Sequence, residues 1–582
     1  AEGAAGRERD LLAEHGHDRG LESVRISDDA KPWPGLHEGA GHRVPGQRLD
    51  DRRQITIEVE PPPHHPVDFP LLFRPGLGAD CDTFVADRDG HRTLAGRCPH
   101  QPCVTALGRV LCLHPGNGMG RQGGEHRQRF DSAFGFEFDI GHVFEYCGDV
   151  SSTTKSPPKV RKPSFVQAWK LAHAQNSIFD DAHTEFGDVF QVNLGRMKWN
   201  VLAHPDAVKQ VFTAPPTVMH AGKGNEILAT ALGDHSVLLL DEKEHMRQRK
   251  LLLPSFHGEK LDAQTATIER ITERQVESIP HGQPFFIRDQ SQEIALEVIL
   301  EVVLGTDATG SEHDRLAEAT KKMLEWISSG LRLVASQVFG PRSAVIKRMY
   351  RPVLEPLDTA LYELIRQRRN EPGLEERDDI LSTLLTAHAE YAKPMTDVEI
   401  RDELVTLIVA GHETTATALA WAFERLTRTP EGTKRLHEES LTEETVYTKA
   451  VSQEALRLRP VLDFVLRRIN EPIEIGGYEF EAGQVVAPCV YLVHRREDIY
   501  PDALAFKPER WLGVKPGTYT WIPFGGGVRR CIGMQFAMAE MEIVLRAVAR
   551  AGVLEPVGTD EKSVSRFITT SPERGGEVRF AI

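Results

Sequence analysis

A glycine-rich turn with a single cysteine, near the C-terminus of the 582-residue chain, constrains the fold more than any other segment. Residues 524–533 read FGGGVRRCIG, and an apolar stretch of helical pattern follows at once, from 534 to 548. Cys531 therefore lies between an arginine pair and a helix N-terminus, both of which stabilise a thiolate relative to a thiol. The segment predicts either a metal-ligand loop that leads into a helix or a buried structural cysteine, the usual fate of a free cysteine.

Size and charge exclude several classes of protein. The chain is long enough for a large catalytic domain with an additional segment. Its net charge is −15, and no basic stripe is interleaved with aromatic residues, so we expect no nucleic-acid partner. No stretch of eighteen apolar residues occurs, which predicts that there is no membrane anchor. The first twenty residues lack the apolar core of a secretory signal.

The cysteines are distributed unevenly along the chain. Five lie early and two late, at positions Cys81, Cys98, Cys103, Cys112, Cys147, Cys489 and Cys531. Two widely separated cysteines in the larger downstream part do not form a disulfide framework. A reducing, cytoplasmic location is the prediction that fits this distribution.

The composition changes abruptly near residue 152. Before this point Arg outnumbers Lys sixteen to one, and after it the ratio is 34 to 19. The early part shows little helical or strand periodicity apart from a short run at 54–59, so it has few periodic apolar residues to offset the entropy of ordering. We predict that residues 1–152 form a poorly ordered N-terminal extension, or translated upstream sequence, and that residues 153–582 form the folded domain.

One constellation in the extension has a metal-ligand character. Cys98 and His100, followed by Cys112 and His114, resemble the paired ligands of a Rieske iron–sulfur centre. The second pair departs from the C-x-x-H spacing of that centre, and the interval between the pairs is short. A zinc site from the same four residues is the alternative.

The downstream part predicts a mainly α domain with a small β region. A helical pattern over 165–182 precedes strand patterns at 187–194 and 198–203, and a helix follows through His204-Pro205-Asp206. Long helical stretches continue to about residue 450. Short strands are expected at 473–475, 478–480 and 485–488, with a Gly-Gly turn between the first two.

A long helix is predicted from Thr396 to about Arg428. Thr396 and Glu399 form a capping box at its start, and Thr429-Pro430 ends it. Roughly 32 residues give a rod of about 48 Å. Its centre, AGHETTAT at 410–417, is a poor helix interior, because glycine and β-branched residues reduce helix propensity. Such a polar spot in an apolar rod indicates either a functional site or a packing notch.

Two of these motifs resemble the cytochrome P450 family. The loop matches the family's F-x-x-G-x-R-x-C-x-G pattern at every position, and residues 410–415 are similar to its A-G-x-[DE]-T-[TS] signature. The resemblance covers about 430 residues and implies the cytochrome P450 fold, with a long central helix over a haem and a cysteine-ligand loop beneath it. It implies that Cys531 is the ligand of the iron in haem b (iron protoporphyrin IX), within a loop bounded by Phe524 and Gly533.

The resemblance also assigns roles on the long helix. Ala410 and Gly411 would be small so that haem and oxygen can approach the backbone. Thr414 would hydrogen-bond dioxygen, and Glu413 would supply protons through water, since two protons are needed to cleave the O–O bond.

Haem propionates are carboxylates that need cationic partners. Residues 245–256, HMRQRKLLLPSF, resemble the family's H-x-x-x-R-[RK]-L-L-x-P-x-F helix, which makes His245 and Arg249 the expected propionate ligands. Arg529 would be a third. The fourth would be Arg467 or Arg468, and the count back from Gly476-Gly477 favours Arg467.

A structural ionic triad is implied by two further elements. Glu454 and Arg457 are three residues apart on one helix, and Pro508-Glu509-Arg510-Trp511 follows downstream. These E-x-x-R and P-E-R-[FW] elements resemble the family's buried Glu454–Arg457–Arg510 arrangement. An ordinary solvated surface pair is the alternative.

The resemblance implies a haem-thiolate monooxygenase that inserts one atom of O2 into a lipophilic substrate, by hydroxylation or epoxidation. No flavin or nucleotide domain follows the motif, so electrons would come from a ferredoxin and a ferredoxin reductase, with Arg530 steering an acidic donor. The alternatives are a peroxide-driven enzyme or an isomerase, against which the intact Glu413–Thr414 pair argues, a haem sensor or sequestering protein, and a two-cofactor redox protein.

Two segments are expected beside the distal pocket, 461–466 and 567–570. Their apolar character is the basis for predicting a lipophilic substrate. Asp463 departs from that character and would contact either a polar substrate group or solvent.

Overall fold

The structure is a computed structural model that describes residues 155–173, 175–195, 197–306, 310–328, 330–387, 394–566 and 568–581. Before them it describes six short strands. The chain divides into two compact units, Ala1–Tyr146 and Cys147–Ile582, and each is described by itself.

The first unit contains three antiparallel strand pairs. They are β1 (Leu36–His37) with β2 (Thr56–Ile57), β3 (Asp82–Thr83) with β4 (Gly96–Arg97), and β5 (Cys103–Ala106) with β6 (Arg109–Cys112). Of the predicted metal ligands there, Cys98, His100 and His114 lie outside the described residues, and Cys112 is described only as the last residue of β6. The metal site and the poorly ordered extension therefore stay predictions.

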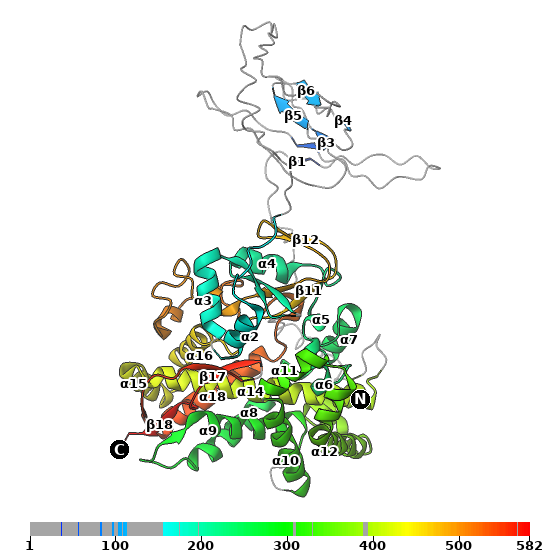
Figure 1. The fold of residues 1–582 in the computed structure, drawn as a ribbon. Coiled ribbons are helices and arrows are strands. Elements are labelled where there is room, and N and C mark those ends of the chain that lie inside the picture. Colours follow the sequence, from blue (N-terminus) through cyan, green and yellow to red (C-terminus); the bar gives the residue numbers. More distant parts are fainter. Residues whose placement is uncertain are drawn as a thin grey trace, which may run out of the picture. The chain divides into compact units, whose positions relative to one another are not determined.

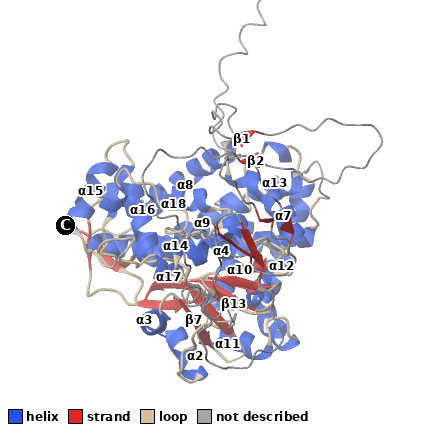
Figure 2. Ribbon diagram, turned by 90° about the horizontal axis from the view of Figure 1, so that it is seen from above, coloured by secondary structure: helices blue, strands red, loops and turns tan. Residues whose placement is uncertain are grey.

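The second unit is mainly helical (Figures 1 and 2). Its α-helices are α2 (Ser164–His173), α3 (Gln175–Phe186), α4 (Pro205–Thr213), α5 (Ala221–Gly224), α6 (Ala229–Leu232), α7 (Glu242–Leu252), α8 (Glu259–Glu277), α9 (Ile287–Val298), α10 (Ser311–Ile327), α11 (Gly330–Phe339), α12 (Ala344–Arg369), α13 (Ile380–Thr386), α14 (Asp397–Thr427), α15 (Pro430–Ser440), α16 (Val446–Leu458), α17 (Val490–Val493) and α18 (Met534–Ala551).

Shorter helical turns connect several of these helices. They are the 3-10 turns η1 (Glu226–Leu228), η2 (Leu253–Phe256), η4 (Leu374–Glu376), η5 (Pro508–Trp511) and η6 (Gly527–Arg529), and the π-helical turn η3 (Ile299–Val303). No described helix is both long enough and apolar enough to cross a membrane.

The strands form a small β region beside the helices. The largest sheet has the order β7 (Val189–Asn193), β8 (Lys198–Leu202), β14 (Val485–Pro488), β11 (Arg467–Ile469) and β9 (Met219–His220), with only the β8–β14 pair parallel. A three-stranded sheet has the order β10 (Phe285–Phe286), β18 (Glu577–Phe580) and β15 (Leu554–Pro556). Two hairpins pair β12 (Ile473–Ile475) with β13 (Tyr478–Phe480), and β16 (Ser563–Arg566) with β17 (Thr569–Pro572).

Most of the predicted elements of the second unit are confirmed. The strands expected at 473–475, 478–480 and 485–488 have these bounds, and both residues of the Gly476-Gly477 turn have positive φ angles of 58° and 78°. The single helix predicted over 165–182 is wrong in one respect, because the structure has two helices there, α2 and α3.

Helix α14 crosses the middle of the helical part (Figure 1) and packs against α9, α12, α16 and α18. Its predicted capping box is present: Thr396 Oγ1 accepts from the amide of Glu399, and Glu399 Oε2 accepts from the amide of Thr396. Pro430 begins α15 and thereby ends the rod. Since α14 is buried on nearly all sides, its long apolar flanks supply much of the main core.

Candidate active site

The cysteine loop owes its shape to glycines that pack against α4. Gly525 and Gly527 have φ angles of +67° and +62°, which favour glycine. A Cβ atom at Gly526 would overlap the ring of Phe212, and one at Gly527 would overlap its carbonyl oxygen. The loop is closed by the Cys531 amide, which donates to the carbonyl of Phe524 over 2.9 Å. Gly533 is the N-cap residue of α18.

The environment of Cys531 differs from the sequence-based prediction. Solvent reaches the residue, yet the protein packed around it raises the pKa of the thiol above its usual value. The amide of Gly533 and the cations Arg249 and Arg530 act in the opposite direction, as expected, but burial outweighs them. A thiolate at this position therefore calls for a stronger cation than the protein supplies, and a bound metal ion deprotonates a thiol outright.

Four predicted propionate ligands gather close to Cys531. His245 lies on α7 and is buried, and burial, Arg529 and Arg249 together lower its pKa to about 4. Arg467 is buried on β11, whereas its neighbour Arg468 is exposed, which agrees with the preference for Arg467. Burial and the Arg529 cation lower the pKa of Arg467 to about 10.

A carboxylate that the sequence did not single out, Asp241, lies among these cations. Arg529 Nη2 donates to Asp241 Oδ1 over 2.6 Å, and Arg529 Nη1 donates to the carbonyl of Val237 over 3.2 Å. Asp241 also accepts from the backbone amides of Gly222 and Lys223. Its N-cap position before α7 was readable from the sequence, but its side chain makes no cap hydrogen bond and binds Arg529 instead.

The centre of α14 contains a short accessible stretch. Between Ile400 and Phe423 the helix is buried except at Ala410, which is exposed, and at Gly411, Glu413 and Thr414, which are half-buried. The Thr414 hydroxyl donates to the carbonyl of Ala410 over 2.5 Å. A Cβ atom at Gly411 would lie 2.5 Å from Cδ1 of Ile299 in η3, so helix packing alone already requires a small residue there.

Glu413 is fixed by helix α9. Arg288 Nη2 donates to its Oε1 over 2.8 Å and Gln292 Nε2 to its Oε2 over 2.9 Å. His412 Nε2 lies 3.1 Å from the carbonyl of Gln292. These partners come from a helix more than a hundred residues earlier in the chain, and the local spacing around Glu413 carries no signal for them.

The predicted ionic triad is formed and buried. Arg457 donates to both oxygens of Glu454 over 2.8 Å, and Arg510 Nε donates to Glu454 Oε1 over 3.0 Å. The side chains of Glu454 and Arg457 are both fully buried. Trp511 Nε1 also donates to Glu454, over 2.9 Å. The surface-pair alternative is therefore wrong.

Asp463 does not meet solvent, so that alternative is wrong as well. Its side chain is 2% exposed, and its Oδ2 accepts from the Thr570 hydroxyl over 2.9 Å. The amide of Thr570 donates to the carbonyl of Val461, and these bonds join the 461–466 segment to β17. Phe567 of the second predicted pocket segment lies outside the described residues.

The residues present fit haem b. A metal-binding sulfur lies in a rigid loop, and three guanidinium groups with one imidazole surround it in excess of the single carboxylate Asp241. A ligand that brings two carboxylates would balance these buried charges. The fold and this donor set together define a haem-thiolate protein.

Comparison with known proteins gives the same result. The family model described as Cytochrome P450 matches residues 156–575. Cytochrome P450 135B1 of Mycobacterium bovis is 36% identical over 442 residues, which are 74% of this chain and 92% of the relative. Cytochrome P450 137 of Mycobacterium tuberculosis is 38% identical over 381 residues, 64% of this chain and 78% of the relative.

A solved structure shares the fold. Retinoic acid bound cyanobacterial CYP120A1 superposes with a TM-score of 0.64 at 21% identity, covering 74% of this chain and all of that chain. The chain belongs to the cytochrome P450 family. It is a haem-thiolate monooxygenase with haem b as its cofactor, and the predicted fold class is confirmed.

Proposed function

We propose that this monooxygenase takes two electrons from a ferredoxin, reduced by a ferredoxin reductase, and hydroxylates or epoxidises a lipophilic substrate with O2. The observation that carries the proposal is the cluster of His245, Arg249, Arg467 and Arg529 around an accessible Cys531. That donor set has both a sulfur for iron and cations for two propionates.

In this proposal Cys531 is the axial ligand, and Phe524 and Gly533 hold the two ends of its loop. Haem, when bound, supplies the redox centre at which O2 is reduced. The propionates are bound by charge from the arginines and by a neutral N–H from His245, because a pKa of about 4 leaves that imidazole uncharged at neutral pH. Ala410 and Gly411 leave room for the cofactor beside α14.

Glu413 and Thr414 are the proposed proton donors. The Thr414 hydroxyl now bonds to the backbone of its own helix, so it must rotate, or share its proton, to donate to a bound oxygen species. Glu413 is held on the α9 side by Arg288 and Gln292, which fixes where its carboxylate can take up a proton. Exchange of protons between the two residues through water would complete the two-proton requirement.

The substrate and partner assignments rest on surface chemistry. Half-buried Val465 and Leu466 and the exposed Ile568 offer apolar contacts, which favours a lipophilic substrate. Arg530 is exposed beside Cys531 and favours an acidic ferredoxin. The cytoplasmic location is proposed from the cysteine distribution.

The decisive experiment is the absorption spectrum of the reduced, carbon-monoxide-treated holoenzyme. We expect the red-shifted band typical of sulfur ligation in the wild type, its loss in Cys531→Ala, and its retention in the control Cys489→Ala, since Cys489 is fully buried elsewhere. A Cys531→Ala variant that keeps the band would disprove the ligand assignment.

A second experiment tests turnover and the proton donors. With a surrogate ferredoxin and reductase, substrate should accelerate NADPH consumption, and the spin-state shift of the haem should report substrate binding. Thr414→Ala should divert reduced oxygen to peroxide by about tenfold relative to product, within the range for loss of an acid–base group. Equal product yield per NADPH in wild type and variant would remove Thr414 from the proposal.

A further inference from the structure

We infer that His494 is a positioning residue that links the buried Glu454–Arg457 pair to the Cys531 loop. His494 follows α17 and has no accessible surface. Its Nδ1 lies 3.1 Å from the carbonyl of Arg457, and its Nε2 accepts from the amide of Ile522 over 2.8 Å. Arg457 in turn donates to the carbonyl of His494 over 2.8 Å. One imidazole therefore touches both the ion pair and the start of the loop.

The contacts fix the tautomer of this imidazole. Nε2 faces an N–H group, so it must be the acceptor, and Nδ1 must then carry the hydrogen that it donates to the Arg457 carbonyl. Burial and the neighbouring Arg457 and Arg495 cations lower the pKa of His494 to about 3, which agrees with a permanently neutral ring. A neutral ring with one donor and one acceptor is a rigid spacer between two backbone segments.

The link continues from Ile522 to the cysteine. The carbonyl of Ile522 accepts from the amide of Gly525, and the carbonyl of Phe524 accepts from the amide of Cys531. Fixing Ile522 therefore fixes the strand of backbone on which the loop closes. Gln453 on α16 adds a second anchor, because its carbonyl accepts from Trp521 Nε1 over 3.1 Å.

This inference deepens the proposed function, since it rests on Cys531 being the iron ligand. It explains why an ion pair on α16 affects a loop that begins about 65 residues later: the pair holds His494, and His494 holds Ile522. The role is one of positioning, because His494 contacts neither substrate nor sulfur among its described hydrogen bonds.

Three substitutions separate the two ends of the imidazole. In His494→Gln the side-chain oxygen reaches the position of Nε2, so the bond to Ile522 is kept. In His494→Asn the amide reaches only the position of Nδ1, so the bond to the Arg457 carbonyl is kept and the one to Ile522 is lost. His494→Leu loses both. The matched control is His437→Leu, because His437 also bonds a carbonyl, that of Ala549, at a helix junction away from the loop.

The first readout is amide hydrogen exchange in the peptide 520–531 of the holoenzyme. We expect about tenfold faster exchange in the Asn and Leu variants, the factor that corresponds to about 1.4 kcal/mol, and no change in this peptide for Gln or for His437→Leu. The second readout is the ratio of sulfur-ligated to other absorption in the reduced carbon monoxide complex, expected in the order wild type, Gln, Asn, Leu.

Equal exchange and equal spectra for the Gln and Asn variants would overturn the inference, and so would a His437→Leu variant that changes the loop as much as His494→Leu. If the Leu variant does not fold, the Gln and Asn pair alone decides. A wild type without the red-shifted band would instead refute the ligand assignment, while the exchange data would still test the link to Ile522.

Discussion

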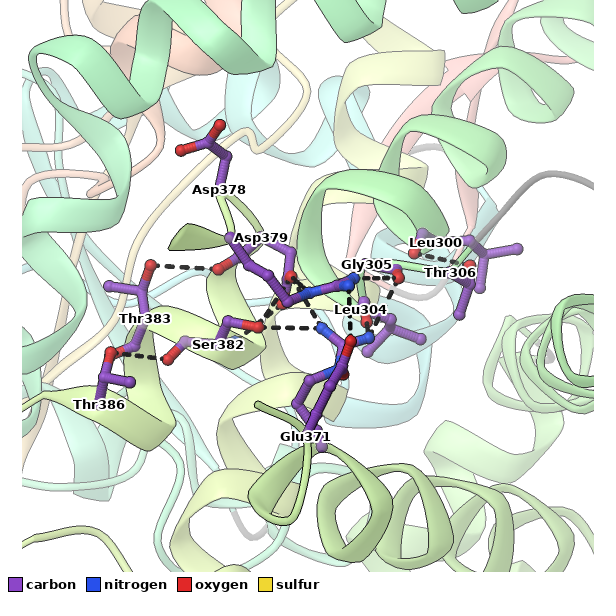
Figure 3. Close-up of polar contacts among 12 residues, drawn as sticks. Leu300, Leu304, Gly305, Thr306, Glu371, Asp378, Asp379, Ser382, Thr383 and Thr386 are labelled. Carbon is purple, nitrogen blue, oxygen red and sulfur yellow. Dashed lines mark hydrogen bonds and ion pairs between the residues drawn. The ribbon is translucent and has the colours of Figure 1, made fainter. Parts of the chain in front are cut away.

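Two buried ion pairs in this molecule are built alike but serve different regions. Glu454 receives Arg457, Arg510 and Trp511 beside the cysteine loop. Asp379 receives Arg368 and Arg377, together with the hydroxyl and amide of Ser382, where α13 begins (Figure 3). Each carboxylate is almost completely buried, and each is surrounded by donors.

The difference lies in what the arginines do with their remaining hydrogens. Arg457 donates to the carbonyls of His494, Ala503 and Ala505, on the side of the site. Arg368 and Arg377 donate to the carbonyl of Gly305, which follows η3, so that pair fastens the α12–α13 turn to the end of α9–η3 (Figure 3). Similar electrostatics therefore supports haem binding in one place and helix packing in the other.

The largest effect is expected for Glu454→Ala. The change leaves Arg457 buried without its carboxylate, and breaking such a pair costs roughly 3–5 kcal/mol. We expect no haem-loaded protein, measured as haem per polypeptide after purification. The control Glu444→Ala removes an exposed carboxylate just before the same helix and should load normally. Normal loading of Glu454→Ala would contradict the comparison.

Arg368→Ala should cost about 3 kcal/mol, the lower end of that range, because Asp379 keeps Arg377 and Ser382. The free energy of unfolding in urea should fall accordingly. The spectrum of the reduced carbon monoxide complex should stay that of the wild type, since this pair does not contact the cysteine loop. A lost band with unchanged stability would reverse the roles assigned to the two pairs.

Acid should weaken the Glu454 side through His494. The imidazole has a pKa of about 3 when folded and the usual 6.5 when unfolded, so its contribution to stability is present above 6.5 and is lost as the pH falls from there toward 3. The slope approaches about 1.4 kcal/mol per pH unit. Urea unfolding at a series of pH values should show a slope shallower by that amount in His494→Gln, and an unchanged slope would contradict the buried neutral ring.

The smallest effect is expected for Arg377→Ala. Its side chain is about one-third exposed, so the loss should be below about 1 kcal/mol. Combined with Arg368→Ala, however, it leaves Asp379 without a guanidinium group, and the double variant should lose more than the two single losses together. Simple additivity in urea unfolding would show that the two arginines do not share Asp379.

The predictable parts of the molecule are those with a local signal. The capping box of Thr396 and Glu399, the Gly476-Gly477 turn and the i, i+3 spacing of Glu454 and Arg457 are all readable within a few residues. Asp379 and Arg368 are eleven residues apart on two elements, and Arg288 meets Glu413 from a distant helix, so only the tertiary fold brings them together.

The Cys531 thiol teaches a related lesson about magnitude. The helix N-terminus and the arginines are visible in the sequence and do lower its pKa, as predicted. The opposing desolvation depends on how densely other segments pack around the loop, and it is the larger effect. Asp241 was missed for the same reason, because its N-cap position suggests a local role that its side chain does not fulfil.

The narrow accessible stretch of α14 sets a limit on how this enzyme can be re-engineered. Only Ala410, Gly411, Glu413 and Thr414 escape the core between Ile400 and Phe423, and two of those four are the proposed proton donors. A combinatorial library along the helix would therefore offer a single position, Ala410, at which selectivity can change without cost to folding or chemistry. Laboratory evolution toward new substrates should accumulate its changes on other walls of the molecule.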